Sequence, residues 1–406
     1  MEEAFLQKNL DLDLYQIVDM LSEAIELSEN GVGRHGKRVA CIAKNIYEKV
    51  FEEPVPCDLV VAAVLHDIGA QNFKLKLDLA RLYPEEDNLE KHSADGEALL
   101  AGVDLFRGIS SLVRNHHKAY KTVKAGLKDR EALCSNIINL ADRIDIAVDK
   151  SANILSQAEE VVNKIQGFPE GFFSQEALKA LKSLSSNLSF WLDINNERRM
   201  DRILKESIAR KISLSYQGLW QIADLCAKMI DRKSPYTAVH SSSVSQVSSR
   251  LSRLFGFDGE QCFFISVAGK FHDLGKLCIP ESILEKPGEL DYNERCIIKQ
   301  HAYYSYHILD RVAEFQGIKK WAAYHHENLD GTGYPFSLKE DQIPMESRIV
   351  AVADKLVALT EDRPYRRKMQ KSEVIKWLKQ AADMNWIDGA VLNKTVQHYD
   401  YVLYGL

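Results

Sequence analysis

The histidines of this 406-residue chain fall into two matching sets, which limits the folds that the sequence can adopt. Ten of the 12 histidines form two groups of five in the same order, and each group ends in a doublet that an aspartate follows. Successive intervals are 31, 26 and 24 residues in the first half and 32, 29 and 24 in the second. The first set is His35, His66, Asp67, His92, His116, His117 and Asp142, and the second is His240, His272, Asp273, His301, His325, His326 and Asp354. We infer a tandem repeat of two similar domains.

Helical periodicity supports the same repeat. Apolar residues follow His35 at offsets of 4, 7 and 11, and they follow His240 at these offsets and at 14, which places each leading histidine on the buried face of a helix. The segments DLVVAAVLHD and CFFISVAGKFHD predict buried helices that end at a His-Asp pair. Convincing alternating strands are scarce. The sequence predicts an all-α protein of two tandem helical domains, residues 1–200 and 205–406, with a polar, charged and helical connector within 193–207.

Composition and charge exclude several classes of protein. No apolar run approaches the roughly 18 residues that a membrane span needs, and the opening MEEAFLQKNLDLDL is acidic, unlike a signal peptide. We therefore expect a cytoplasmic protein that does not bind a membrane. The seven cysteines lack paired spacing, which argues against disulfides and against a thiolate zinc site. The net charge of −6 and the absence of a nucleic-acid-binding signature exclude a nucleic-acid polymer as the main partner.

Each set offers five imidazoles and two carboxylates on buried helices. A single inward histidine is more often a structural core residue, but two copies of one seven-residue pattern favour metal sites. Imidazole suits Fe, Mn, Zn or Ni, and a carboxylate can bridge two cations. Two such cations lower the pKa of a bridging water and stabilise displacement at phosphorus. The pattern therefore predicts phosphoester hydrolysis, without naming the ester.

Five motifs in the second half resemble the HD-GYP domain, a branch of the HD phosphohydrolase superfamily that hydrolyses cyclic dinucleotide messengers. They are HDLGK, ILEKPGEL, HHENLDGTGYP, RIVAVADKLVALT and RPYR, between residues 234 and 366. The resemblance implies two HD-type domains, of which the second is a full HD-GYP domain. It also implies that the second histidine set holds two divalent transition ions, Fe or Mn before Ni, with Asp273 as the bridge. A metal-bridging water would then open the cyclic dinucleotide to the linear dinucleotide.

The same resemblance assigns residues to the substrate. Lys276 ends the HDLGK motif and would contact the scissile phosphate, as an ammonium point charge can. Arg363 and Arg366, in RPYR, would hold substrate phosphates through their guanidinium groups. Gly331 and Tyr334 belong to the GYP turn, where the tyrosine would either touch the nucleotide or pack against the protein.

Two positions depart from the family. Tyr236 stands where some members carry a glutamate and hold a third metal, so we predict a binuclear site. Val357 stands three residues after Asp354, where the family commonly has an aspartate. We expect this change to remove a carboxylate that would support the metal ligands.

The first half keeps every ligand position but lacks the GYP turn and RPYR, and Ala70 replaces the lysine that Lys276 supplies in the second. We therefore expect the second domain to catalyse and the first, which can still bind metal, to modulate it. The alternative is an inert duplicate whose histidines tie its core together.

This tandem arrangement resembles phosphodiesterases that degrade 3'3'-cyclic GMP-AMP, with cyclic di-GMP as the other candidate substrate. Other hypotheses are a different HD-superfamily nucleotide phosphohydrolase and a non-catalytic messenger-binding scaffold. The two halves would form an intramolecular pseudo-dimer, or two chains a homodimer.

Overall fold

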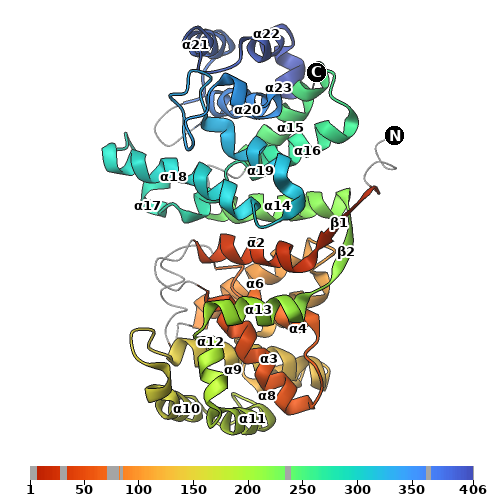
Figure 1. Ribbon diagram of the computed structural model, residues 1–406, viewed down its shortest axis with the longest axis vertical. Coiled ribbons are helices and arrows are strands. Elements are labelled where there is room, and N and C mark those ends of the chain that lie inside the picture. The colour runs from red at the N-terminus through yellow and green to blue at the C-terminus, as the bar shows by residue number, and fades with distance from the viewer. Residues whose placement is uncertain are drawn as a thin grey trace. The chain divides into compact units, whose positions relative to one another are not determined.

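The computed structural model describes residues 7–27, 34–70, 82, 86–233, 239–362 and 367–405. The chain divides into two compact units, Met1–Gly218 and Leu219–Leu406. Helices dominate both units, which confirms the predicted all-α class (Figure 1). None of the helices in the described part of the chain is long and apolar enough to cross a membrane.

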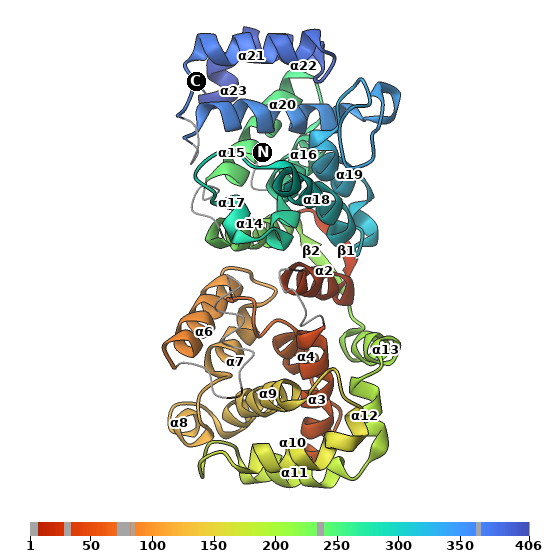
Figure 2. The ribbon, with the colours of Figure 1, turned by 90° about the vertical axis from the view of Figure 1, so that its left-hand side faces the viewer.

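The first unit is a set of helices closed by a small sheet. Its elements are β1 (Asn9–Asp13), α2 (Leu14–Glu26), α3 (His35–Phe51), α4 (Cys57–Val64), α6 (Glu86–Ala101), α7 (Ser110–Asn115), α8 (Tyr120–Lys124), α9 (Asp129–Ala147), α10 (Ala158–Gln166), α11 (Gln175–Ser185), α12 (Leu188–Ile194), α13 (Glu197–Ile208) and β2 (Lys211–Ser215). In Figure 2, α9 lies against α3, and these two helices do pack together. Because α9 is buried nearly all round, with Ile137, Leu140 and Ile144 fully buried, it forms the centre of the unit.

The second unit repeats this plan. The helix α14 (Tyr216–Lys233) leads into it, and its further elements are α15 (His240–Leu254), α16 (Gly259–Phe271), η4 (Leu274–Cys278), α17 (Glu281–Leu284), α18 (Tyr292–Leu309), α19 (Gln316–Ala323), η6 (Tyr324–His326), α20 (Met345–Thr360), α21 (Lys371–Asp383), α22 (Gly389–Gln397) and α23 (Tyr399–Tyr404). The helix α15 packs on α16 and on α20, as α3 packs on α4 and on α9 in the first unit. Val350, Val352 and Leu356 of α20 are fully buried, so α20 takes the central place.

The strands β1 and β2 are the element that the sequence analysis missed. They pair antiparallel, with Asp11 opposite Ser213 and Leu12 opposite Ile212. Their sequences, NLDLD and KISLS, alternate polar and apolar residues, which is the pattern of a strand with one buried face. The segment 193–207, expected to be a helical connector, contains the end of α12 and most of α13, and it lies within the first unit.

Candidate metal centres

The second set of histidines converges from five elements of the second unit. His240 is the first residue of α15, His272 and Asp273 directly follow α16, His301 lies in α18, the doublet ends η6, and Asp354 lies in α20. All of these residues are buried except His326, which is half-buried. Both leading histidines, His35 and His240, face inward at the start of their helices, which confirms the helical phase read from the sequence.

Asp273 lies between two groups of histidines. Its Oδ2 is 3.1 Å from His272 Nε2 and 3.9 Å from His240 Nε2, whereas its Oδ1 is 3.4 Å from His301 Nε2. Asp354 Oδ1 completes the first group, at 3.1 Å from His240 Nε2. The possible ligand atoms of His240, His272 and Asp273 lie within 4.8 Å of one another, and so do those of His301, His325 and His326. One carboxylate therefore faces both groups, as a bridging ligand must.

The hydrogen bonds of the imidazoles fit a cation. Each Nδ1 of His272, His301 and His325 is 2.6 to 2.7 Å from a backbone carbonyl three residues earlier. Because a carbonyl only accepts, Nδ1 carries the proton and Nε2 keeps its lone pair. The buried His272 Nε2 has no hydrogen-bond partner among the described residues, and the Nε2 atoms of His301 and His325 face each other at 3.3 Å. Bare lone pairs in close approach are what a divalent transition ion satisfies.

A glycine allows α18 to approach the His-Asp pair. A Cβ atom on Gly275 would lie 2.0 Å from the carbonyl oxygen of His301, which is too close for any side chain. The Gly275 amide donates to Ser305 Oγ at 2.8 Å, and Ser305 in turn donates to the His272 carbonyl at 2.9 Å. In the first unit, a Cβ on Gly69 would lie 2.1 Å from the His92 carbonyl. The glycine of each HD motif thus sets the distance between two ligand-bearing elements.

The expectation that Val357 leaves the metal ligands without a supporting carboxylate is wrong, because Glu361 supplies one. His240 Nδ1 donates to Glu361 Oε2 at 3.0 Å, so a carboxylate does support this histidine although position 357 is a buried valine. In the first unit Asp145, three residues after Asp142, does the same for His35, with a distance of 2.7 Å between His35 Nδ1 and Asp145 Oδ2. Glu361 lies one helical turn beyond Val357. Scanning one further turn for an acidic residue would have found it.

Of the residues predicted to contact the substrate, Lys276 and Tyr334 lie at the second histidine cluster and Gly331 lies in the GYP turn. Lys276 Nζ forms an ion pair with Asp273 Oδ2, so its ammonium lies at the histidine cluster. Tyr334 stacks on His326 with a centroid distance of 4.8 Å and an interplanar angle of 29°. Gly331 has a φ of 84° in the GYP turn, a conformation that favours glycine. Arg363, Arg366 and Tyr236 lie outside the described residues.

Glu327, which the sequence analysis did not single out, holds the GYP turn in place. Its carboxylate accepts hydrogen bonds from the amides of Phe336, at 2.6 Å, and Leu338, at 2.9 Å. The glutamate follows His326 directly, so the turn that carries Tyr334 is fastened beside the histidine doublet. Its signal in the sequence is the E of HHENLDGTGYP.

The electrostatics of the cluster suit a cation. Burial alone would raise the pKa of Asp273, but His272 and Lys276 hold it well below its usual range. Burial lowers the pKa of His301 to about 4, and it also lowers the pKa values of His325 and His326 well below 6.5. Near neutral pH these three imidazoles are therefore neutral and the carboxylate is charged, which is the protonation state that binds metal.

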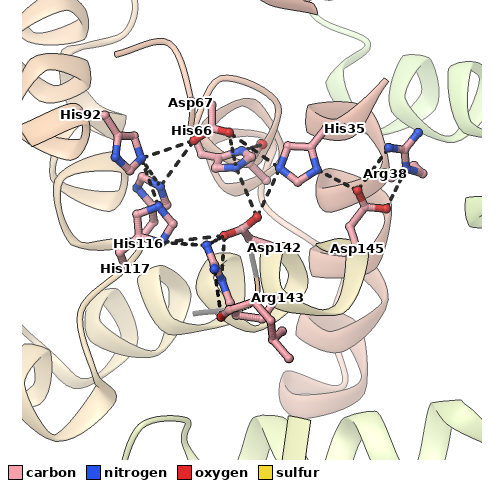
Figure 3. A network of polar contacts seen from close by, with 12 residues as sticks. His35, Arg38, His66, Asp67, His92, His116, His117, Asp142, Arg143 and Asp145 are labelled. Carbon is pink, nitrogen blue, oxygen red and sulfur yellow. Dashed lines mark hydrogen bonds and ion pairs between the residues drawn. The ribbon is translucent and has the colours of Figure 1, made fainter. Parts of the chain in front are cut away.

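The first set converges in the same way (Figure 3). Asp67 Oδ2 is 3.4 Å from His66 Nε2 and 3.7 Å from His35 Nε2, and its Oδ1 is 3.3 Å from His92 Nε2. The ligand atoms form two groups, His35 with His66 and Asp142, and Asp67 with His92, His116 and His117. The buried His66 Nε2, like its counterpart His272, has no hydrogen-bond partner among the described residues. All fourteen sequence-predicted ligand positions are therefore assembled in two clusters.

Arg143 distinguishes the first cluster from the second. Its guanidinium bonds Asp142 Oδ2, with Nε at 3.1 Å, and lies 3.4 Å from His117 Nδ1 (Figure 3). At the corresponding place after Asp354, Lys355 turns to the His325 carbonyl, at 3.1 Å. The first cluster thus has a fixed cation on the side of its histidine doublet. Ala70, where the second unit has Lys276, is buried and packs against Leu89.

Comparison with known proteins agrees with the geometry. The HD domain family matches residues 32–147 and again residues 224–391. The 3'3'-cGAMP-specific phosphodiesterase 1 of Vibrio cholerae is 30% identical over 376 residues, which cover 90% of this chain and 86% of that protein. The 3'3'-cGAMP-specific phosphodiesterase 3 of the same organism is 32% identical over 212 residues, 52% of this chain and 46% of that protein. The cyclic di-GMP phosphodiesterase of Thermotoga maritima is 34% identical over 176 residues, 43% and 48% of the two chains.

A crystal structure of a cyclic GMP-AMP-specific phosphodiesterase of V. cholerae shares the fold, with a TM-score of 0.65 and 20% identity over 96% of this chain and 98% of that chain. Two domain matches and a relative that is similar over 90% of the sequence point the same way. The chain belongs to the HD-domain family of cyclic dinucleotide phosphodiesterases.

Proposed function

We propose that the second unit hydrolyses a cyclic dinucleotide messenger to the linear dinucleotide, with 3'3'-cyclic GMP-AMP as the preferred substrate and cyclic di-GMP as the alternative. The observation that carries this proposal is the position of Asp273, whose two oxygens face two separate histidine groups. The relatives that cover most or half of the chain are named as 3'3'-cGAMP-specific enzymes, which favours that messenger. We place this activity in the cytoplasm.

We further propose that the second cluster holds two divalent transition ions. Iron and manganese are the favoured metals, and nickel is the alternative. The ligands would be His240, His272, Asp273, His301, His325, His326 and Asp354. When bound, such a pair supplies an acidified water and neutralises charge at a phosphodiester. The protein itself keeps each Nε2 unprotonated, through the carbonyl acceptors behind His272, His301 and His325.

The remaining residues would orient the substrate. Lys276 already lies against Asp273, so its ammonium is within reach of a phosphate placed at the cluster. Tyr334 covers one face of His326. Lys299 lies over the Tyr334 ring, with its ammonium 5.4 Å from the ring centroid. It therefore adds positive charge near the place proposed for the substrate phosphate. Arg363 and Arg366 are proposed to hold the second phosphate.

The first domain, residues 1–200, is proposed to modulate the catalytic domain, residues 205–406. Its cluster retains all the ligand types, but Ala70 leaves it without the phosphate-positioning lysine. Arg143 adds a fixed positive charge to that cluster. An internal cation beside Asp142 would compete with a second metal ion, so we expect weaker metal binding there than in the second unit.

The test is turnover of 3'3'-cyclic GMP-AMP, cyclic di-GMP and cyclic di-AMP by the full chain loaded with Mn or Fe, with Asp273→Asn and Asp67→Asn as matched variants. We expect Asp273→Asn to abolish hydrolysis and Asp67→Asn to change only its rate. Metal analysis should give two ions in the second unit. One ion there, with hydrolysis of a nucleoside triphosphate instead, would identify another kind of HD phosphohydrolase, and tight messenger binding without turnover would identify a scaffold.

A further inference from the structure

A cavity of about 580 Å³ opens beside the histidine cluster of the first unit. This volume lies within the roughly 300–1,000 Å³ that small-molecule sites occupy. His117 and Arg143 of the cluster form part of its wall, and Phe168, Phe172 and Asn139 form another part. In the second unit the counterpart of His117 is His326, and Tyr334 stacks on it. Among the described residues, no aromatic ring other than histidine stacks on His117 in this way, and the cavity lies there instead.

The aromatic side of the cavity is held rigidly. The rings of Phe168 and Phe172 lie 5.0 Å apart. The Phe172 carbonyl accepts hydrogen bonds from the Tyr120 amide, at 2.8 Å, and from Asn136 Nδ2, at 3.0 Å. Asn136 Oδ1 also accepts the Ser174 amide, at 2.8 Å. The loop is therefore fastened to α8 and α9, and its rings form a preformed apolar platform, which lowers the entropic cost of binding a flat ligand.

Asn139 presents an unsatisfied group. It is 1% exposed, and its Nδ2 donates to the Lys118 carbonyl at 3.2 Å. Its Oδ1 is buried and has no hydrogen-bond partner in the described part of the chain. A buried acceptor without a donor is costly, and it calls for a specific partner. An N–H group on a ligand in the cavity would supply one.

The charged groups around the cavity favour an anion. Three cationic residues line it, Arg114, Lys118 and Arg143, against the single acidic residue Glu90, which pairs with Arg114. The Arg143 side chain is 3% exposed, so its charge is only weakly screened by solvent.

We propose that this cavity binds a nucleotide, with the phosphate at Arg143 and Lys118, the base against Phe168 and Phe172, and a base N–H donating to Asn139 Oδ1. The first unit is then a nucleotide sensor, and the further step, in which this signal modulates the second unit, rests on the proposed function. Binding here does not depend on the chemistry proposed for the second unit. The two ideas therefore fail separately.

The test is isothermal titration calorimetry of the full metal-loaded chain with GMP and with AMP. Two further probes are guanosine, which lacks the phosphate, and ribose 5-phosphate, which lacks the base. We expect one nucleotide to bind to the first unit of each chain, and we expect this binding to require both the base and the phosphate. Stacking contributes about 1–3 kcal/mol per base, so Phe168→Leu should weaken this site by about 5- to 150-fold. Asn139→Leu, which keeps the size but removes the acceptor, should weaken it as well.

Tyr334→Leu is the matched control, because it alters the corresponding face of the second cluster. It should leave the first-unit site intact while reducing any mononucleotide binding to the second unit. Unchanged metal content and thermal melting would show that the variants are folded. The proposal is overturned if no nucleotide binds, if ribose 5-phosphate or guanosine binds as tightly as GMP, or if both first-unit variants bind like the wild type.

Discussion

His240 donates its Nδ1 hydrogen to Glu361 at 3.0 Å, across 121 residues of sequence. This bond fixes the tautomer in which His240 Nε2 carries a lone pair, 3.1 Å from Asp354 Oδ1. A carboxylate behind a ligand histidine also raises the basicity of the ring. Glu361 is thus a positioning residue for the second cluster, and it replaces the aspartate that the sequence lacks at position 357.

Replacing Glu361 should therefore weaken metal binding without unfolding the protein. We expect Glu361→Ala to lower metal affinity about 10- to 100-fold, whereas Glu361→Gln, which keeps an acceptor oxygen, should lose much less. The measurement is a competition titration with a chromogenic chelator. Val357→Asp, made in the Glu361→Ala background, should recover part of the affinity. A purely structural role for Glu361 would leave the affinities of all three variants alike.

Metal removal should lower the stability of both units. Without a cation the Nε2 atoms of His301 and His325 face each other at 3.3 Å, and those of His92 and His117 at 3.0 Å. A ligand at 100 times its Kd stabilises the folded state by about 2.7 kcal/mol per site. We expect chelation to lower Tm and re-addition of Mn to restore it, measured by differential scanning calorimetry. Identical Tm values with and without metal would contradict the assignment of these clusters as metal sites.

Lys276→Ala should slow hydrolysis while leaving the metals in place. Loss of one preorganised charge at a phosphate costs on the order of 10²-fold in kcat. Lys276→Arg keeps the charge and should retain more activity. Steady-state kinetics and metal analysis on the same preparations check this. If the alanine variant loses its metals instead, the main role of Lys276 is to support Asp273.

Gly275→Ala should destabilise the second unit. Its new Cβ would meet the His301 carbonyl at 2.0 Å, and overpacking of this kind costs about 1–3 kcal/mol or more. Gly259→Ala is the matched control, since a Cβ there has nothing within 4 Å and the position begins the helix α16. Urea denaturation should separate the two variants clearly. Equal midpoints would mean that η4 and α18 can move apart freely.

The ligand sets could be predicted from the sequence because repeated spacing and helical phase together fix which side chains face the core. His35 and His240 confirm this, since each lies buried at the start of its helix. Arg143 could not be predicted, because the direction of its side chain depends on tertiary packing. Glu361 could be found only by extending the search one turn beyond position 357, outside the family motif. The cavity depends on Phe168 and Phe172, in a loop that no motif marks. The strand pair had a signal, NLDLD and KISLS, but each stretch is only five residues long.

The β1–β2 ribbon has a practical consequence for anyone who shortens this chain. The Tyr216 amide donates to the Lys8 carbonyl at 2.8 Å and the Leu14 amide to the Arg210 carbonyl at 3.0 Å, so residues 8–14 and 210–216 form one continuous antiparallel pair. A fragment that starts after Asp13 but retains Lys211–Ser215 would carry an orphan strand with Ile212 and Leu214 uncovered. Such an edge recruits strands from other chains and promotes aggregation. Fragments that begin at Tyr216, or that keep Asn9 through Ser215 intact, avoid this hazard.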